Sequence, residues 1–262
     1  MDLLLQEPFT YLDAFLLVFV RMISFFIAVP LFGIRNIPRT TKIAIAFFTA
    51  AIMISIQPMT LDVSSAQIIP YAILVVKEFI VGWIIGFGAY LAFSIITLAG
   101  QLIDYQIGFT MVNVFDPLSQ VQITITGNLY YYLLLLMMLA TNTHYILIKG
   151  LVNSFEWIPI GTSTFKIGLY TEIINFFGDF FIIALQIAAP MIGSMLIINV
   201  VLGILARATP QMNMFVVGLP LKLMVGLVVL LITLAVFPHV SDWIFERMLK
   251  LVDTIVKGMS SL

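Results

Sequence analysis

Two carboxylates in the middle of an apolar sequence, Asp104 and Asp116, are the side chains best placed for chemistry. Ionisable groups in apolar surroundings are costly, so each is a candidate for a functional role. Acid–base catalysis needs a second group within hydrogen-bonding reach, and no histidine or further acid stands close to either residue in the sequence. The structural alternative is that they cap helix ends or face water, and Asp116 followed by Pro117 is a typical helix start. The residue types therefore favour no catalytic site.

Metal and nucleotide chemistry find little support. Cysteine is absent, which excludes disulfides and thiolate ligands. The two histidines, His144 and His239, are far apart, and no second ligand follows His144 at the third or fourth position. The chain has no glycine-rich phosphate loop with its lysine, and its basic residues are too scattered for a nucleic-acid surface. We expect no metal, no cofactor and no nucleic-acid partner.

Other charges stand alone in apolar sequence and need partners from elsewhere in the fold. Lys77 and Glu78 are adjacent, so on a helix they point in different directions and do not naturally pair with each other. Four more charges are isolated in the same way: Arg21, Asp179, Arg207 and Lys222. Pairing with another helix or another subunit explains them better than contact with a substrate.

The elements that carry these residues are membrane helices. Hydrophobic residues make up 62% of the 262 residues and charged residues 10%, against about half and about a quarter in soluble domains. Several charge-free stretches approach or exceed the roughly 20 residues that cross a hydrocarbon layer. Four of them are bounded by Glu78 and Asp104, Asp116 and Lys149, Asp179 and Arg207, and Lys222 and Asp242. The fold class that they predict is an all-α polytopic membrane protein.

Hydropathy predicts six helical segments followed by a tail. The segments cover residues 9–32, 43–56, 71–100, 129–149, 172–205 and 212–237. In the tail, residues 240–262, apolar side chains recur at three-to-four spacing opposite charged ones. We therefore expect an amphipathic helix that lies on a membrane surface or against a partner. On the third segment, Gly82 and Gly86 have the spacing that lets helix backbones approach closely.

One stretch departs from this pattern. Between residues 101 and 128 the apolar run is interrupted by Asp104, Asn113, Asp116, Pro117 and further polar residues and glycines. Non-helical backbone at membrane depth is tolerated only where protein or a water-filled cavity surrounds it. We therefore expect this segment to be sheltered inside protein, beside an aqueous passage.

The same stretch carries a family resemblance. It reads GQLIDYQIGFTMVNVFDPLSQVQITITGN (100–128), and its most specific elements are Gln106-Ile107-Gly108-Phe109, Phe115-Asp116-Pro117 and Gly127-Asn128. Similar positions outside it are Arg21, Pro30, Ile37-Pro38, Ala189-Pro190 and Ala208-Thr209-Pro210-Gln211-Met212-Asn213. Through these residues essentially the whole chain resembles the FliR family of flagellar export-gate proteins.

The resemblance implies an architecture and a function. Residues 1–184 would be a FliP-like helical region with an irregular plug loop at about 104–127, and residues 185–262 a FliQ-like helical hairpin with its amphipathic tail. The chain would be a non-enzymatic structural subunit of the flagellar type III protein-export gate, in the bacterial inner membrane within the flagellar basal body. The implied partners are FliP and FliQ in a hetero-oligomeric ring, FlhB, the unfolded flagellar proteins that cross the channel, and membrane lipid.

Two sets of site residues are expected, and the first follows from the resemblance. The plug would contain Gln106, Gly108, Phe109, Met111, Asn113, Phe115, Asp116 and Pro117. Of these, Phe109, Met111 and Phe115 would occlude the passage, while glycine and the Asp-Pro step would give the loop its turns and mobility. Packing against other subunits is expected at Gly82, Gly86, Arg207, Gln211 and Asn213.

Three alternatives stay open. The export-gate subunits of injectisomes share this fold, although the pattern of Gln101, Gln106 and Asn113 with Val-Phe-Asp-Pro looks more flagellar. A secondary transporter of small solutes would show paired half-repeats with matching interrupted helices, whereas this chain has one interrupted segment. An intramembrane enzyme would need a paired nucleophile and base, or a set of metal ligands.

Overall fold

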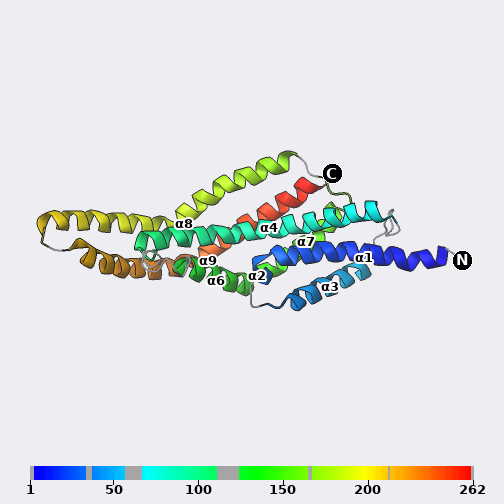
Figure 1. Cartoon of the computed structure of the whole chain (residues 1–262), viewed down its shortest axis with the longest axis horizontal. Helices are drawn as coiled ribbons and strands as arrows, with labels where there is room; N and C mark the ends of the chain where they lie inside the picture. Colours follow the sequence, from blue (N-terminus) through cyan, green and yellow to red (C-terminus); the bar gives the residue numbers. More distant parts are fainter. Residues whose placement is uncertain are drawn as a thin grey trace. The chain divides into compact units, whose positions relative to one another are not determined.

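The computed structural model describes residues 3–33, 37–56, 67–110, 124–164, 167–211 and 213–260. Over these ranges the chain forms eight helices and no strand (Figure 1), which confirms the all-α fold class. The helices are α1 (Leu3–Ala28), α2 (Pro30–Gly33), α3 (Arg39–Ile56), α4 (Ile68–Ile107), α6 (Ile125–Ala140), α7 (Thr143–Trp157), α8 (Ile167–Ala208) and α9 (Met214–Met259).

The lengths and composition of the helices fit a protein that crosses a membrane several times. In the described part of the chain, four helical stretches are long and apolar enough to cross: Arg39–Ile56, Ile68–Ile107, Thr171–Ala208 and Val216–Met259. A fifth is added if α6 and α7, which are separated by a short break, count as one interrupted span. Helix α4 has 40 residues and is therefore ~60 Å long, about twice the thickness of a hydrocarbon layer.

Helix α4 extends further than the sequence pattern suggests. An irregular segment was expected from Gln101, but α4 continues to Ile107. No glycine or proline occurs between Gln101 and Ile107, and Ile103 and Ile107 are buried at helical spacing. Residues 125–127 likewise belong to α6. The part of the predicted plug loop from 111 to 123 lies outside the described residues.

Two further helix boundaries differ from the expectation. One helix was expected over 129–149, but the chain breaks between α6 and α7, where Asn142 has a left-handed backbone with φ of 57°. Asparagine adopts this conformation more readily than most residues. Conversely, the predicted sixth segment and tail form the single helix α9, which contains Pro220 and Pro238. A proline inside a helix removes one backbone hydrogen bond. The helix continues with no more than a kink where neighbouring helices satisfy the freed backbone groups.

The helices group into two compact units. Unit 1 contains Met1–Leu91, Asn142–Phe176 and Glu246–Leu262, and unit 2 contains Ala92–Thr141 and Phe177–Phe245. Helices α4, α8 and α9 each contribute to both units. The predicted boundary at residue 184 separates a FliP-like from a FliQ-like region by family resemblance, and it does not refer to compact units. It falls inside α8 and stays a prediction.

The amphipathic tail packs against its own chain. Its apolar stripe, which recurs at three-to-four spacing, is buried at Ile244, Met248, Leu251, Ile255 and Met259. In unit 1 this end of α9 lies beside α4, and the backbone amide of Thr164 donates a hydrogen bond to the Met259 carbonyl at 3.1 Å. The chain itself thus covers the apolar stripe. This differs from both expected locations of the tail, a membrane surface and a partner protein.

In unit 1, α1 packs against α4 through two glycines. A Cβ atom added at Gly82 would collide with the Ser24 hydroxyl and the Arg21 carbonyl, and one added at Gly86 would lie 2.7 Å from the Ala28 Cβ. The spacing of these glycines therefore brings two helices of the same chain together, as small residues do in membrane helices.

Replacing Gly82 by alanine is expected to lower the stability of the protein by about 1–3 kcal/mol, because α1 must move away from the added methyl group. Gly150→Ala is the matched control. It makes the same change in α7 of unit 1, where an added Cβ meets no atom within 4 Å, and helix propensity predicts equal or higher stability. Thermal unfolding of the purified chain in detergent measures both variants. Equal transition temperatures would contradict the close packing of α1 on α4.

Candidate functional site

The predicted plug segment leaves α4 through a glycine turn in unit 2. Gly108 has φ of 98°, a left-handed conformation that commonly ends helices and favours glycine. The amides of Gly108 and Phe109 both donate hydrogen bonds to the Asp104 carbonyl, each at 3.0 Å. The turn explains why the family-like motif has glycine at this position.

Asp104 also holds the point where the chain returns. Its carboxylate accepts a hydrogen bond from the backbone amide of Thr126, at 3.0 Å to one oxygen and 3.2 Å to the other. Thr126 lies in the first turn of α6, whose own N-cap residue, Thr124, makes no side-chain cap bond. Asp104 thus supplies from α4 the acceptor that a helix N-terminus requires. Of the two structural alternatives for Asp104, a helix cap or a side chain that faces water, the structure shows the cap, and the capped helix is a different one from its own.

Close backbone contact makes this cap possible. Gly100 lies one helical turn before Asp104 on the same face of α4, and a Cβ added there would collide with the backbone of Gly127. The first turn of α6 therefore rests directly on α4. Asp104 is almost fully buried at 1% exposure, so water does not compete for its carboxylate.

A hollow of about 610 Å³ opens beside this turn, within unit 2. Gln106, Gly108 and Thr110 line it from the end of α4, Asn199 and Gly203 line it from α8, and Lys222 lines it from α9. Two of the predicted plug residues, Gln106 and Gly108, therefore face a common space. The other members of that set, Met111, Asn113, Phe115, Asp116 and Pro117, lie outside the described residues, and Phe109 directly follows the glycine turn.

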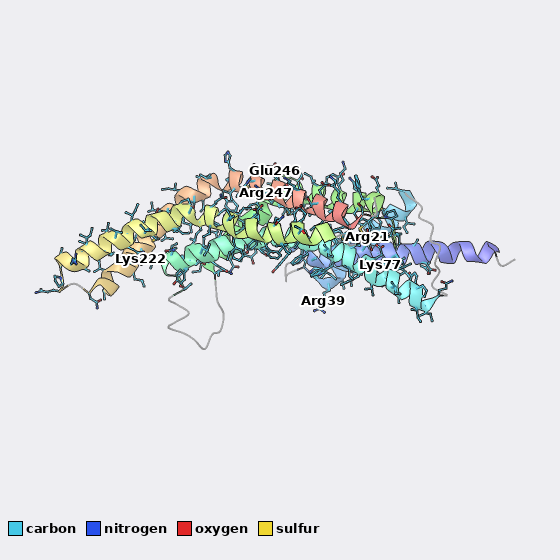
Figure 2. All side chains as sticks on the ribbon, turned by 90° about the horizontal axis from the view of Figure 1, so that it is seen from above. Arg21, Arg39, Lys77, Lys222, Glu246 and Arg247 are labelled. Carbon is cyan, nitrogen blue, oxygen red and sulfur yellow. The ribbon has the colours of Figure 1, made fainter. Side chains whose placement is uncertain are left out.

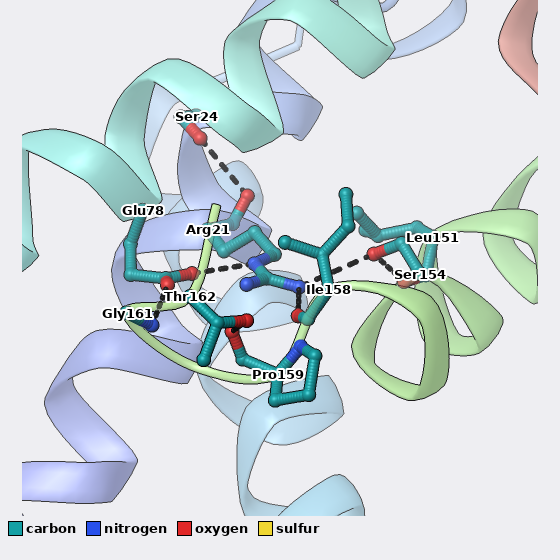
Figure 3. A network of polar contacts seen from close by, with 9 residues as sticks. All are labelled: Arg21, Ser24, Glu78, Leu151, Ser154, Ile158, Pro159, Gly161 and Thr162. Atoms are coloured by element: carbon teal, nitrogen blue, oxygen red, sulfur yellow. Dashed lines mark hydrogen bonds and ion pairs between the residues drawn. The ribbon is translucent and has the colours of Figure 1, made fainter. Parts of the chain in front are cut away.

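A second polar cluster is buried in unit 1 (Figure 3). The Arg21 Nε donates to the Glu78 Oε2 at 2.5 Å, and both side chains are fully buried. The Arg21 Nη1 donates to the Ile158 carbonyl at 3.0 Å, and the guanidinium lies 4.0 Å from the centre of the Phe155 ring. The amide of Gly161 donates to the other Glu78 oxygen at 2.9 Å.

The ion pair confirms, for Arg21 and Glu78, that an isolated charge finds its partner on another helix. Arg21 on α1 pairs with Glu78 on α4, and the adjacent Lys77 instead reaches the Gly161 carbonyl at 3.4 Å. The sequence did not identify Gly161, whose φ of 79° turns the chain after α7. The only signal was the run of proline, glycine and hydroxyl residues at 159–164. The cluster joins α1, α4 and α7 without a nucleophile paired to a base.

The remaining predicted packing residues surround the turn between α8 and α9 in unit 2. Arg207, Gln211 and Asn213 are exposed there. Arg207 lies in the last turn of α8, where a positive charge interacts favourably with the helix dipole. In the described part of the chain, no three His, Asp or Glu side chains come together in a group that could hold a metal ion.

Comparison with known proteins identifies relatives along the whole chain. Residues 12–248 match the family described as Bacterial export proteins, family 1. The flagellar biosynthetic protein FliR of Bacillus subtilis is 39% identical over 228 residues, which cover 85% of this chain and 86% of that protein. FliR of Aquifex aeolicus is 29% identical over 264 residues, covering 100% of both chains, and FliR of Escherichia coli is 27% identical over 256 residues, covering 97% of both.

Removing one partner of the buried ion pair is expected to destabilise the protein strongly. Arg21→Met leaves Glu78 charged and unpaired, and such a change costs about 3–5 kcal/mol. The double variant R21M/E78M should recover most of the loss, because apolar replacement of both partners is often neutral. Asp253→Asn is the control, since it removes the exposed Asp253–Lys257 pair and should cost less than about 1 kcal/mol. Thermal unfolding measures the stability of both single variants and of the double variant. A loss in R21M/E78M equal to the sum of the losses in the two single variants would contradict a direct pairing.

Asp104→Ala is expected to loosen the first turn of α6, at a cost of about 1–2 kcal/mol, because the Thr126 amide loses its acceptor. Asp104→Asn keeps one oxygen acceptor and should lose less. Asp242→Asn, on the exposed side of α9 in the same unit, is the control. Hydrogen exchange at the amides of residues 125–127 measures the effect. Unchanged exchange in Asp104→Ala would contradict the capping role.

Proposed function

The chain belongs to family 1 of the bacterial export proteins, the family of the flagellar biosynthetic proteins FliR, and we propose that it is a subunit of the flagellar protein-export gate. In this proposal the protein forms part of the channel wall for unfolded flagellar proteins. The segment after α4 is the plug that obstructs the channel at rest. The subunit contributes structure, and the energy for transport comes from other components.

One observation carries the plug assignment: a single residue of α4 holds both ends of the segment. The Asp104 carbonyl accepts the amides of Gly108 and Phe109, and the Asp104 carboxylate accepts the amide of Thr126. A loop with tethered ends loses less entropy when it takes up a defined position than a free chain does. Loops positioned in this way on a rigid helical scaffold commonly carry function.

The residues of the segment suit an obstruction. Phe109 directly follows the turn, and Met111 and Phe115 follow it in the sequence. Apolar side chains can close a water-filled passage by excluding water from a constriction, and methionine adapts its shape to irregular gaps. Gly108 permits a backbone turn that other residues adopt with strain.

The location and the partners belong to the same proposal. The protein would lie in the bacterial inner membrane, in the flagellar basal body, and complete a ring with FliP and FliQ subunits next to FlhB. The broad apolar faces of α3, α8 and α9, with Phe48, Ile197 and Leu231 among their exposed residues, supply surface for such neighbours. The flagellar names of the relatives favour a flagellar gate over an injectisome gate.

Deleting Gly108–Pro117 is expected to open the resting gate to ions, because the obstructing side chains are lost while Asp104 stays in place. The deletion variant, co-expressed with FliP and FliQ, is assayed for ion leak across the inner membrane. A second variant replaces the same ten residues by glycine and serine, so that the loop keeps its length but loses its apolar groups.

Both variants should leak, whereas the wild-type protein should not. Co-purification with FliP and FliQ provides the control for assembly. If either variant assembles normally and membrane conductance remains at the wild-type level, the segment does not obstruct the channel. A wild-type chain that is equally stable with and without FliP and FliQ would instead argue against the proposed ring.

A further inference from the structure

The hollow in unit 2 is lined by small residues on two of its helices. Gly203 and Ala206 face it from α8, and Gly218 faces it from α9. Lys222 lies one helical turn after Gly218 and one turn before Gly226, so the three share one face of α9. Gly226 packs against Ile107 at the end of α4. At about 610 Å³, the space is within the usual size range of small-molecule sites.

The charge of the hollow is unbalanced. Among the described residues that line the hollow, Lys222 is the one cationic side chain and none is a carboxylate (Figure 2 labels Lys222 on α9). The backbone end of α4 contributes a partial negative charge of about half an elementary charge. Lys222 therefore dominates with a full positive charge. Among the described residues no carboxylate pairs with Lys222, and an ammonium in largely apolar surroundings is unfavourable. The described lining is therefore complementary to an anion.

The hollow also lies at the right depth for a lipid headgroup. Lys222 lies at one end of the charge-free stretch that runs to Asp242. The 19 residues between these two charges cover ~28 Å as a helix, about the thickness of a hydrocarbon layer, which places Lys222 near the edge of that layer. A lysine there can extend its flexible stem so that the ammonium reaches the headgroup region.

The lining combines polar and apolar groups in the way that an amphiphile requires. The Gln106 and Asn199 amides and the Thr110 hydroxyl are able to donate hydrogen bonds, whereas Leu202 and Leu219 are apolar. Next to them, the outward faces of α8 and α9 expose Ile204 and Val216. Acyl chains could therefore continue from the hollow along an apolar surface.

We propose that this hollow binds the headgroup of an anionic phospholipid, whose phosphate pairs with Lys222 while its acyl chains lie along α8 and α9. The site borders Gln106 and Gly108, where the segment beyond α4 begins. Bound lipid would thus contact the base of the glycine turn, and the lipid composition of the membrane could influence that segment. The proposal does not depend on the chain being an export-gate subunit.

The test uses the purified full-length chain and native mass spectrometry in detergent. Dioleoyl-phosphatidylglycerol and dioleoyl-phosphatidylcholine are titrated separately, because they share their acyl chains and differ in the headgroup, which is anionic in the first and zwitterionic in the second. The wild-type chain should retain phosphatidylglycerol preferentially. Lys222→Gln should weaken that binding by about fivefold or more, the value of one lysine at an anionic membrane surface. Lys222→Arg keeps the charge and should bind nearly as the wild type does.

Arg207→Gln is the matched control, because it removes an exposed cation near the same turn without changing the hollow. It should alter phosphatidylglycerol binding far less than Lys222→Gln does. Inorganic phosphate at millimolar concentration should not displace the lipid, since it lacks the apolar contacts. Displacement by phosphate, equal retention of both lipids, or equal losses in Arg207→Gln and Lys222→Gln would each overturn the proposal.

Discussion

The hydrogen bond from the Thr126 amide to the Asp104 carboxylate is the interaction on which the middle of this protein depends. It caps α6 from a neighbouring helix, and the Asp104 carbonyl anchors the departing chain at Gly108 and Phe109. The contact is available because Gly100 lets the first turn of α6 rest on α4. A costly buried carboxylate is thus compensated by backbone amides, which a helix N-terminus must satisfy in any case.

The same requirement explains the buried charges of unit 1. Arg21 and Glu78 are both inaccessible to water, and each has further partners in the chain that follows α7. A buried ion pair is weak evidence for added stability, but breaking one side of it is expensive. Its clearest effect is therefore to specify one arrangement: α1, α4 and the turn at Gly161 are all needed to satisfy both charges.

Apolar surface is distributed very unevenly among the helices. In the most apolar stretch of α4, 61% of the residues are buried within the chain, against 28% for α8 and 17% for α3 and α9. Helices with so little cover need lipid or other protein around them. This fits a membrane protein that meets neighbours in an assembly, and it explains how Lys222 can lie in a hollow bordered by apolar surface. Beside so much apolar surface, the single charge of Lys222 strongly influences which ligand binds in the hollow.

The sequence by itself determined the membrane class, the helical fold, the two close glycines and the need of Arg21 and Glu78 for distant partners, because composition and 3.6-residue periodicity act locally. It also predicted a role for Gln106 and Gly108 through their motif, and that role stays a prediction. It could not reveal that α4 continues to Ile107 or that α9 passes through Pro238, since both depend on what packs alongside. Only the tertiary structure decided which charges meet and that the tail folds onto its own chain. Asp104 shows the reason. A carboxylate can cap a helix, exchange a proton or face water, and it caps a helix here because the first turn of α6 packs beside it.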